Sequence, residues 1–565
     1  MLSRRNRYFL AILSGVLLGL AFPPTGIAGS LLAFVALVPL LFVLEDGTRL
    51  RTAFKYSWIA MFVLGLVANY WVGGWKSMSE VDPFLMVGGV LLAVVHPFFL
   101  IVPWLLYDII RRRVSRTAAL YSLPFLQAGF EYAHSFGDLA YPWLNFYNTQ
   151  TYNLGYVQFI EFTGPYLLSI FIVLVNVEVF QLLCSKGQEG RKRLVTHGVA
   201  LVLLILVPYL YGAFALAQHE VSRTSVRVTI IQPNIDPWAK WYTDEQRTLD
   251  TNFNATITAL RACHDSTDLV LWPETAITFY ITTPAKSYEL GELYRFINAM
   301  GHPLLTGFPD RQDYVAGRDS IPPDANYTGI DSVYYRSWNA AMVIYEDSTG
   351  HMHREVYHKQ KLVPLGEHIP FVEYFPFLGK WFQWNVGIGS WNYGYGYEPL
   401  RLPLSKSEEV PNGPDTLRIT PTICYESIYP SFVRHFVKHG ANMLAVITND
   451  GWYGRSSGPY QHEQFAVLRA IEDRRWVVRS ANTGVSAVID DRGHIVKSLP
   501  LFTSGSITYR VPLIERKTLY VRLGDYIAIP SMYFGILTTV WGLGNWLRRR
   551  LRRRRSQPNP SGSRG

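Results

Sequence analysis

Long apolar stretches separated by basic clusters are the feature that most restricts the fold of this 565-residue chain. A helix needs about 20 apolar residues to cross a bilayer. Stretches that reach or approach this length lie at about 8–22, 27–45, 54–73, 84–110, 118–134, 164–184, 195–216 and 525–547. One water-soluble core cannot bury all of them, so the sequence predicts an all-α bundle of eight transmembrane helices.

The first stretch has a second interpretation, because Arg4, Arg5 and Arg7 precede an apolar run as in a secretory signal peptide. A signal peptide ends in a small-x-small cleavage site. This run ends in Phe-Pro-Pro instead, and another apolar stretch follows at once. We therefore expect a retained helix.

The basic residues occupy alternate loops. They are Arg4, Arg5, Arg7, Arg49, Arg51, Lys55, Arg111 to Arg113, Arg116, Lys186, Arg191 to Arg193 and Arg548 to Arg555, apart from Leu551. The short loops between these clusters contain a single basic residue, Lys76. Because cytoplasmic loops are enriched in Lys and Arg, the pattern predicts that both termini are cytoplasmic and that the large middle region lies outside. The formal charge of +10 thus indicates a membrane, and no nucleic acid partner is expected.

Aromatic residues mark the loops on the other side of the predicted membrane. They are Tyr70, Trp71, Trp75, Tyr141, Trp143, Phe146 and Tyr147. Such residues can form an interfacial belt, or they can line a groove through which lipid enters beneath the outer domain. The sequence leaves both possibilities open.

The middle of the chain has a different, α/β pattern. Short β-branched runs lie at 226–232, 268–272, 341–345, 416–424, 443–448, 476–479 and 485–489, with helix-like segments at 244–262 and 461–474. Alternating strands and helices predict a layered α/β domain. We expect transmembrane helices 1–7 in 1–217, a soluble domain in 218–515 and helix 8 in 516–548. A long loop is expected at about 310–337, and a basic disordered cytoplasmic tail at 549–565.

Glu274 is the first candidate for chemistry, because it follows the apolar run Leu-Val-Leu-Trp-Pro at 269–273. A carboxylate at a buried strand end loses hydration and can act as a general base. Lys359 closes another strand-like run and precedes a Pro- and Gly-rich loop that contains Glu367. Taken alone, Pro-Glu after a strand can simply begin a helix, and a lysine can lie on a solvated strand face.

Cys424 directly follows an apolar strand, in Ile-Cys-Tyr-Glu. With Cys184 and Cys263 the chain has three cysteines and no CxxC, so no disulfide framework is expected. A buried structural cysteine is one interpretation. A nucleophile is the other, since a sharp turn after a strand exposes a side chain and leaves the following N–H groups free for an oxyanion. No His/Cys/Asp cluster has convincing ligand spacing, so neither metal nor cofactor is expected.

Together these segments resemble the nitrilase superfamily, and the whole chain resembles the apolipoprotein N-acyltransferases of Gram-negative bacteria. The motifs are Trp-Pro-Glu (272–274), Tyr-x-Lys-x-x-Leu-Val-Pro-x-Gly-Glu (357–367), Ile-Cys-Tyr-Glu (423–426), Asn-Asp-Gly-Trp-Tyr-Gly (449–454), Gln-His (461–462), Arg-Ala-Ile-Glu (469–472) and 481–490. The resemblance implies an αββα sandwich in the periplasm, fused to a bundle in the inner membrane. It also implies a Glu-Lys-Cys triad of Glu274, Lys359 and Cys424.

The implied reaction moves an acyl chain from a phospholipid to the free α-amino group of a diacylglyceryl-cysteine on an apolipoprotein. Glu274 would be the general base, Cys424 the nucleophile that carries a thioester, and Lys359, with the Tyr425 N–H, the oxyanion stabiliser. Trp241 and Tyr425 are candidates for excluding water. Glu367 is expected near Lys359 and Glu426 behind the nucleophile, where support and direct catalysis remain open.

Two rival functions follow from the same residues. A membrane-tethered nitrilase-type amidohydrolase could use this triad on a small amide, and a transporter or binding protein could carry an inactive relative of the domain. The first leaves the apolar bundle unexplained, and the intact triad disfavours the second. A monomer is expected.

Overall fold

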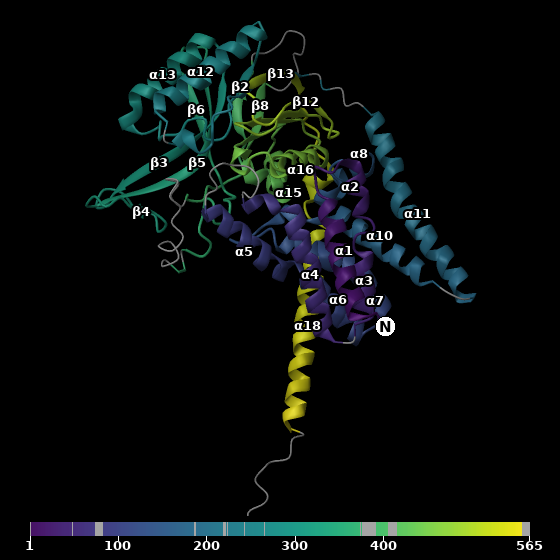
Figure 1. Cartoon of the computed structure of the whole chain (residues 1–565). Coiled ribbons are helices and arrows are strands. Elements are labelled where there is room, and N and C mark those ends of the chain that lie inside the picture. Colours follow the sequence, from purple (N-terminus) through teal and green to yellow (C-terminus); the bar gives the residue numbers. More distant parts are fainter. Residues whose placement is uncertain are drawn as a thin grey trace, which may run out of the picture.

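The computed structural model describes residues 2–47, 49–73, 83–185, 188–218, 222, 224–241, 243–264, 266–372, 374–375, 391–404 and 415–555. Two bodies are visible in Figure 1: a two-sheet α/β sandwich, and a helical bundle beneath it. Trp75, Lys76, Lys186 and the tail 556–565, all part of the sequence predictions, lie outside the described residues.

The first sheet of the sandwich has seven strands, in the order β13-β1-β2-β3-β5-β4, with β6 also paired to β5. The strands are β1 Ser225–Gln232, β2 Leu269–Leu271, β3 Leu304–Val315, β4 Asn326–Tyr327, β5 Val333–Glu346, β6 Met352–His358 and β13 Gly505–Pro512. β1, β2 and β3 are parallel to one another, and the other pairs are antiparallel.

The second sheet has six strands, in the order β12-β11-β10-β9-β8-β7. They are β7 Leu400–Pro403, β8 Thr416–Ile423, β9 Met443–Thr448, β10 Val477–Ala481, β11 Ser486–Ile489 and β12 Ile495–Leu499. β9 and β10 are buried along their whole length, which explains their unbroken apolar character. Ser480 on β10 donates a hydrogen bond to the Ile231 carbonyl of β1, 3.0 Å away, so the two sheets face each other.

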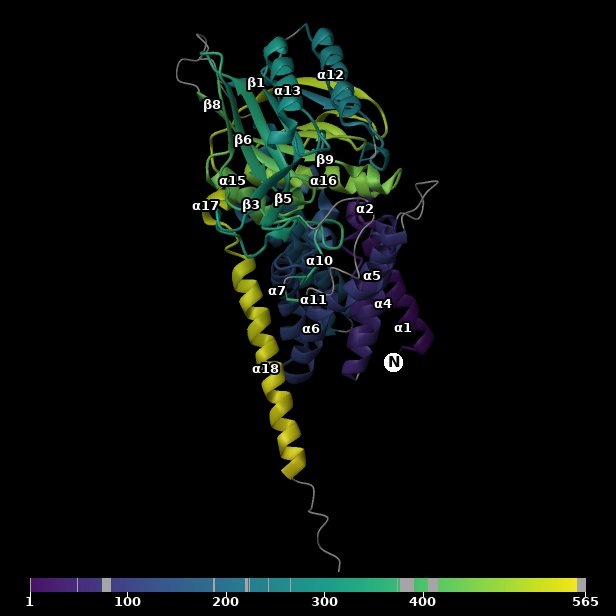
Figure 2. The ribbon, with the colours of Figure 1, turned by 90° about the vertical axis from the view of Figure 1, so that its left-hand side faces the viewer.

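Helices cover both outer faces of the sheets and complete an αββα sandwich (Figure 2). α12 Glu245–Ala262 and α13 Ser287–Met300 lie over the first sheet, where Leu249, Leu260 and Leu293 enter an apolar cluster. α15 Pro430–Lys438 and α16 Gly458–Asp473 cover the second sheet on the side that faces the bundle. The predicted α/β class and the helices near 244–262 and 461–474 are therefore present.

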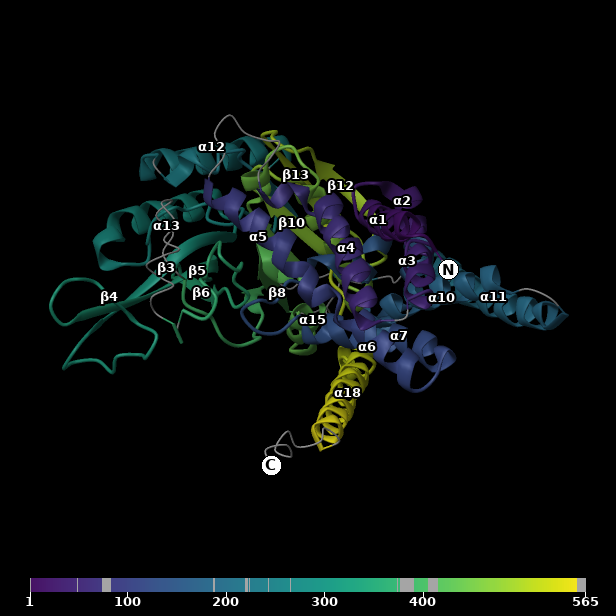
Figure 3. The same cartoon turned by 60° about the horizontal axis from the view of Figure 1, so that its bottom comes forward.

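The segment 310–337, predicted as a long loop, is the outer part of a β-hairpin arm, in which 310–315, 326–327 and 333–337 are strand and the residues between them form loops. β3 and β5 remain paired without a break from Leu304–Ile344 to Val315–Val333. Ring contacts support the polar end of the arm, where the Arg311 guanidinium lies 4.4 Å from the centre of the Tyr335 ring. The arm projects away from the bundle (Figure 3). Its polar composition reflects solvent on both faces and not the absence of a strand.

The bundle contains a helix in each predicted membrane stretch. These are α1 Arg4–Leu20, α2 Gly26–Leu32, α3 Val38–Glu45, α4 Leu50–Ala68, α5 Pro83–Leu100, α6 Val102–Arg113, α7 Arg116–Ala133, α10 Tyr166–Cys184, α11 Gln188–Ala217 and α18 Ala528–Arg555. Short elements connect them: η1 Tyr70–Gly73, η2 Pro142–Leu144, η3 Phe146–Gln150, α8 Leu154–Val157, α9 Ile160–Thr163 and α17 Leu519–Leu523.

Within the described ranges, four helical segments are long and apolar enough to cross a membrane: Leu50–Ala68, Met86–Arg113, Tyr166–Cys184 and Gly190–Ala217. The second of these combines α5 and α6, which a single turn residue at 101 separates. The stretch predicted at 27–45 is not one helix but two short ones, α2 and α3, separated by turns at 33–37. Its apolar residues still pack inside the bundle, since Ala33, Leu37 and Leu40 are fully buried. Hydropathy alone therefore identified a buried segment without giving its helix length.

Basic residues gather at the end of the bundle that lies away from the sandwich. Arg7 pairs with Asp46 at 2.7 Å, and Arg116 pairs with Glu45 at 2.6 Å, so two separate clusters meet at the end of α3. The N-terminus and the far end of α18 point the same way (Figures 1 and 2). α18 continues to Arg555, so residues 549–555, predicted as part of the tail, extend the helix.

α16 joins the two bodies, because it lies between the second sheet and the bundle and is buried except at Tyr460. The Gln461 side chain accepts hydrogen bonds from the indoles of Trp71 (3.1 Å) and Trp143 (2.7 Å). At the end of the helix, Arg474 forms a buried ion pair with Glu161 of α9 at 2.7 Å. These polar contacts fix the orientation of the sandwich on the bundle.

Candidate active site

Three strand ends bring the predicted triad to one cavity. Glu274 follows β2 by three residues, Lys359 directly follows β6, and Cys424 directly follows β8 at the start of η6 Cys424–Ile428. All three line a cavity of about 450 Å³ between the sandwich and the bundle. Glu274 and Lys359 belong to the first sheet and Cys424 to the second, so the cavity joins the two sheets as well as the two bodies.

Lys359 is the centre of a buried charged network. Its ammonium lies 3.2 Å from Glu274 Oε1 and 2.8 Å from Glu367 Oε1, and its side chain is 1% exposed. Asn339 of β5 donates to the same two oxygens, at 2.8 and 3.0 Å. Two of the three ammonium hydrogens thus have carboxylate acceptors, and the described residues provide no third acceptor. One N–H remains for an oxygen of a substrate.

The charges of this network act on both the lysine and the cysteine. Burial alone would lower the pKa of Lys359, but the carboxylates of Glu274 and Glu367 outweigh it and raise that pKa above the usual lysine value. Lys359 is therefore a fixed cation. Burial, and next the charge of Glu274, raise the pKa of the Cys424 thiol, while Lys359 opposes this effect. Cys424 at rest is a thiol, and it needs a base to become a nucleophile.

A tightly packed turn holds Glu274 in place. A Cβ atom on Gly307 of β3 would lie 2.7 Å from the Glu274 Cα and 2.6 Å from the Thr275 nitrogen, so only glycine allows this approach. Thr275 itself has φ +47, which is strained for a β-branched residue. The buried Lys240 ammonium donates to the Thr275 hydroxyl and, at 3.3 Å, to its carbonyl. Burial lowers the pKa of Lys240 to about 8, although Glu274 partly opposes this shift.

Cys424 occupies a strained turn of its own, with φ +51. Glu426 supports this turn, because its fully buried carboxylate accepts from the Ile423 nitrogen at 2.8 Å. The other oxygen of Glu426 accepts from the Tyr357 hydroxyl and the Gln360 nitrogen, both at 2.6 Å. Glu426 thereby links the cysteine turn to the strand end that carries Lys359. Burial raises the pKa of Glu426 to about 7.

The remaining predicted residues also reach the cavity. Trp241 ends η4 Ala239–Trp241 and lines the cavity wall, as does Tyr425, whose hydroxyl donates to the Ala140 carbonyl of the bundle at 2.9 Å. Glu367 lies in the loop after Lys359, where its Oε2 accepts from the Val363 nitrogen at 2.9 Å. Glu367 therefore contacts the triad directly, whereas Glu426 contacts the backbone around it.

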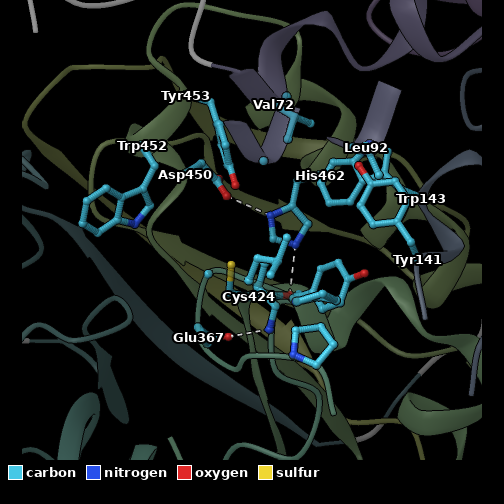
Figure 4. Close-up of a pocket in the computed structure, with 18 of the residues that line it drawn as sticks. Val72, Leu92, Tyr141, Trp143, Glu367, Cys424, Asp450, Trp452, Tyr453 and His462 are labelled. Carbon is cyan, nitrogen blue, oxygen red and sulfur yellow. Dashed lines mark hydrogen bonds and ion pairs between the residues drawn. The ribbon is translucent and has the colours of Figure 1, made fainter. Parts of the chain in front are cut away.

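The wall opposite the triad is apolar and comes from the bundle. It includes Gly88, Leu91, Leu92, Val95 and Phe99 of α5, together with Val72 and Leu139. Among the aromatic residues of the outward loops, Trp71 lines the cavity, and so do Tyr141 and Trp143 (Figure 4). Phe146 and Tyr147 are buried inside the bundle. These five aromatic residues therefore occupy two environments, the cavity wall and the interior of the bundle.

Sequence reasoning assigned no role to Asp450 and His462, which lie beside Cys424 (Figure 4). Cys424, Asp450 and His462 each place one potential metal-ligand atom (sulfur, carboxylate oxygen or ring nitrogen) within 4.8 Å of the other two. His462 Nδ1 is 2.8 Å from Asp450, and its Nε2 is 3.0 Å from the Cys424 carbonyl. Because protein partners already engage both imidazole nitrogens, the group is poorly suited to a metal ion. Asp450 and His462 belong to the motifs Asn-Asp-Gly and Gln-His, which stand out in the sequence. The sequence does not indicate that the two side chains contact each other.

Comparison with known proteins agrees with this architecture. Residues 227–518 match the carbon-nitrogen hydrolase family, which defines the class of the sandwich. Residues 14–177 match the apolipoprotein N-acyltransferase N-terminal domain. The chain belongs to the apolipoprotein N-acyltransferase family. It is 34% identical to the apolipoprotein N-acyltransferase of Chlorobaculum tepidum over 94% of this chain and 95% of that protein.

A second relative is the apolipoprotein N-acyltransferase of Geobacter metallireducens, at 32% identity over 93% of both chains. Among solved structures, an amidase from Nesterenkonia sp. is similar, with a TM-score of 0.35 and 17% identity over 55% of this chain and 97% of that one. The apolar helices and the family together identify a membrane protein.

Proposed function

We propose that this enzyme transfers an acyl chain from a membrane phospholipid to the free α-amino group of the N-terminal diacylglyceryl-cysteine of apolipoproteins. The observation that carries the proposal is the cavity, whose floor is the Glu274, Lys359 and Cys424 group and whose opposite wall is apolar α5. A single space thus offers a nucleophile, a base and a cation to a substrate with a long hydrocarbon chain.

In the first half of the reaction, Glu274 accepts the thiol proton and the thiolate attacks the phospholipid ester carbonyl. The free N–H of Lys359 and the backbone N–H of Tyr425 stabilise the tetrahedral oxyanion. Glu274 returns the proton to the leaving alkoxide, and the products are a thioester on Cys424 and a lysophospholipid. The raised pKa of the resting thiol fits this order, since the proton leaves only when an acceptor is in place.

In the second half, the lipoprotein amine attacks the thioester, and Cys424 leaves as a thiol after proton transfer through Glu274. Amines attack thioesters more readily than esters, but water competes, so the site must be dry. Trp241 and Tyr425 form part of the wall that would exclude water. Glu367 would hold Lys359 in position, and Glu426 would hold the cysteine turn.

The bundle allows the chain to stay in apolar surroundings during transfer. Drawing about 16 carbons into water would cost roughly 12 kcal/mol, at about 0.8 kcal/mol per CH₂. A cavity that opens along α5 avoids this cost. A membrane-tethered hydrolase of small amides would not need an apolar wall, so this geometry does not favour that alternative.

The topology and location form part of the proposal. We infer eight spans in the bacterial inner membrane, with α2 and α3 together forming the second, cytoplasmic termini, and the domain 218–515 in the periplasm. The ion pairs of Arg7 with Asp46 and of Arg116 with Glu45, which bring two basic clusters to the far end of the bundle, support this orientation. A cysteine placed at Asp313 on the exposed hairpin should react with an impermeant maleimide in cells with a permeabilised outer membrane. One at Arg193, in the predicted cytoplasmic basic cluster, should react only after lysis.

The central test is mass spectrometry of the protein purified from membranes, before and after hydroxylamine. We expect an acyl adduct on Cys424 that hydroxylamine removes and that is absent in Cys424→Ser and Glu274→Ala. Adding a diacylglyceryl peptide should move the label from the protein to the peptide amine. Free fatty acid as the main product, with the peptide present and unmodified, would mean that the enzyme is a hydrolase.

A further inference from the structure

A buried chain of polar groups runs behind Cys424 and includes no member of the proposed triad. Arg479 of β10 donates to Asp450 Oδ2 at 2.7 Å. Asp450 Oδ1 lies 2.8 Å from His462 Nδ1, and Ser427 completes the chain, with its hydroxyl 2.9 Å from His462 Nε2. All these side chains are buried in the protein. Figure 4 shows His462 between Asp450 and Cys424.

The hydrogen-bond partners determine which nitrogen of His462 carries a proton. Burial would raise the pKa of Asp450, but Arg479 and His462 outweigh this and lower it, so Asp450 is a carboxylate that only accepts. His462 Nδ1 must therefore donate to it. At the other nitrogen, Ser427 gives its only hydroxyl hydrogen to the Cys424 carbonyl at 2.8 Å. The Ser427 oxygen and the Cys424 carbonyl can then only accept from His462 Nε2.

Both nitrogens of His462 therefore act as donors, which makes the ring an imidazolium. One contact suggests the opposite: Arg479 Nη2 lies 3.1 Å from His462 Nδ1 and would suit a neutral nitrogen. That same Nη2 makes a shorter bond to Asp450, and a neutral Nδ1 would place its lone pair 2.8 Å from a carboxylate oxygen. The neutral ring leaves this repulsion uncompensated.

The charges in this chain do not cancel. One carboxylate stands against a guanidinium and an imidazolium, so the group as a whole carries one net positive charge. Of its members, a ring nitrogen of His462 and a carboxylate oxygen of Asp450 lie within 4.8 Å of the Cys424 sulfur. The other charged or titratable groups that face the sulfur or the imidazole are Glu274, Glu367 and Lys359 from the first sheet, and Tyr453, Glu426 and Glu463 from the elements around Cys424. Around Lys359 the two carboxylates exceed the single cation.

We propose that His462 is a positioning and electrostatic residue of the acyl transfer, which Asp450 holds as an imidazolium so that its charge stabilises the Cys424 thiolate. This inference rests on the proposed role of Cys424 as the nucleophile. It assigns the two sides of the sulfur different tasks, since Glu274 removes the proton and His462 stabilises the charge that remains. Through its bond to the Cys424 carbonyl, the imidazole also supports the strained turn.

The test is the rate of Cys424 alkylation by iodoacetamide as a function of pH, in the full-length protein in detergent and without lipid substrate. Peptide mass spectrometry separates Cys424 from Cys184 and Cys263, which serve as internal references. In His462→Gln, whose amide keeps a donor without the charge, the Cys424 profile should move to higher pH by at least about one unit. Alkylation at neutral pH should then fall roughly tenfold. At high pH the two rates should converge.

His462→Asn should shift the profile in the same direction, because its amide is also uncharged. It also provides the test if His462→Gln does not fold. Ser427→Ala is the matched control, since it removes a hydrogen bond to the Cys424 carbonyl but leaves the charge, and its profile should stay within a few tenths of a unit. Unshifted profiles in both charge variants would overturn the proposal. So would an equal shift in Ser427→Ala, because the effect would then come from the turn.

The alkylation assay uses no acyl donor, so its outcome is independent of the reaction catalysed. If Cys424 forms no acyl adduct in membranes but the alkylation profile shifts as expected, the electrostatic inference holds and the proposed function fails. If the adduct forms and the alkylation profile does not move, the proposed function holds and the electrostatic inference fails.

Discussion

The sandwich and the bundle provide different walls of the same cavity. The sandwich contributes charged groups in a fixed arrangement: Lys359 has two carboxylate neighbours, and the turns at Glu274 and Cys424 are strained and multiply hydrogen-bonded. The bundle contributes a mainly apolar wall, with Leu91, Leu92, Val95 and Phe99 of α5. In the proposed mechanism, chemistry and binding of the acyl chain are thus separated in space. Changes to the charged floor should affect all acyl donors alike, whereas changes to the apolar wall should depend on the chain.

The largest effect should come from Lys359→Met, which removes the cation from the charged floor. We expect acyl transfer to fall by at least about 10³-fold for every donor, because the oxyanion loses its charged partner. Two carboxylates would also remain buried without their counter-ion, so unfolding should become easier by about 3–5 kcal/mol. Turnover with radiolabelled phospholipid and thermal melting measure the two effects. Lys361→Met, two residues along, is the matched control and should stay within a few-fold of the wild type.

Glu426→Gln should have the next largest effect, since it weakens the link between the cysteine turn and the strand end of Lys359. Glutamine replaces one of two accepting oxygens with an N–H group, which would face a backbone or hydroxyl donor. We expect a cost of about 2 kcal/mol in the alignment of the two halves, and a fall in kcat of roughly 30-fold. Equal kcat in the two proteins would show that the turn keeps its geometry without this link.

Leu92→Trp tests the apolar wall. Leu92 lines the cavity, so a larger side chain should shorten the space for hydrocarbon. We expect kcat/KM to fall about tenfold for donors with 16-carbon chains and much less for donors with 8-carbon chains. Val87→Trp is the control on the same helix, because Val87 is 51% exposed and does not line the cavity. An equal loss of kcat/KM for both chain lengths would show that the apolar wall does not select the acyl chain.

The smallest effect should come from Lys240→Met, behind the charged floor. Loss of the bonds to Thr275 should reduce kcat several-fold by loosening the Glu274 turn. The pKa of Lys240 is about 8 in the folded protein and about 10.4 in an unfolded chain. Between these values the unfolded chain binds more protons, so wild-type stability should gain a contribution as pH rises from 8 to 10.4. Melting temperatures across this range should show that contribution in the wild type and not in the variant.

The charged floor was easier to predict from the sequence than its surroundings. Glu274 and Cys424 each come after a short apolar strand, and Lys359 closes a more polar strand-like run. These local patterns can be read in the sequence itself. Asp450 and His462 lie on different elements, η7 Asp450–Tyr453 and α16, and only the packing of α16 against the second sheet brings them to the sulfur. No spacing in the sequence encodes that contact. Tertiary packing also made the hairpin arm and the broken second span unpredictable.

The burial of α16 on both faces bears on how the protein can be studied in parts. A fragment limited to the sandwich would expose the surface that Trp71 and Trp143 now cover, and it would leave Arg474 without Glu161. Such a fragment should aggregate and fold poorly, even though it contains Glu274, Lys359 and Cys424. The bilayer-embedded portion is thus a folding partner of the enzyme as much as its anchor.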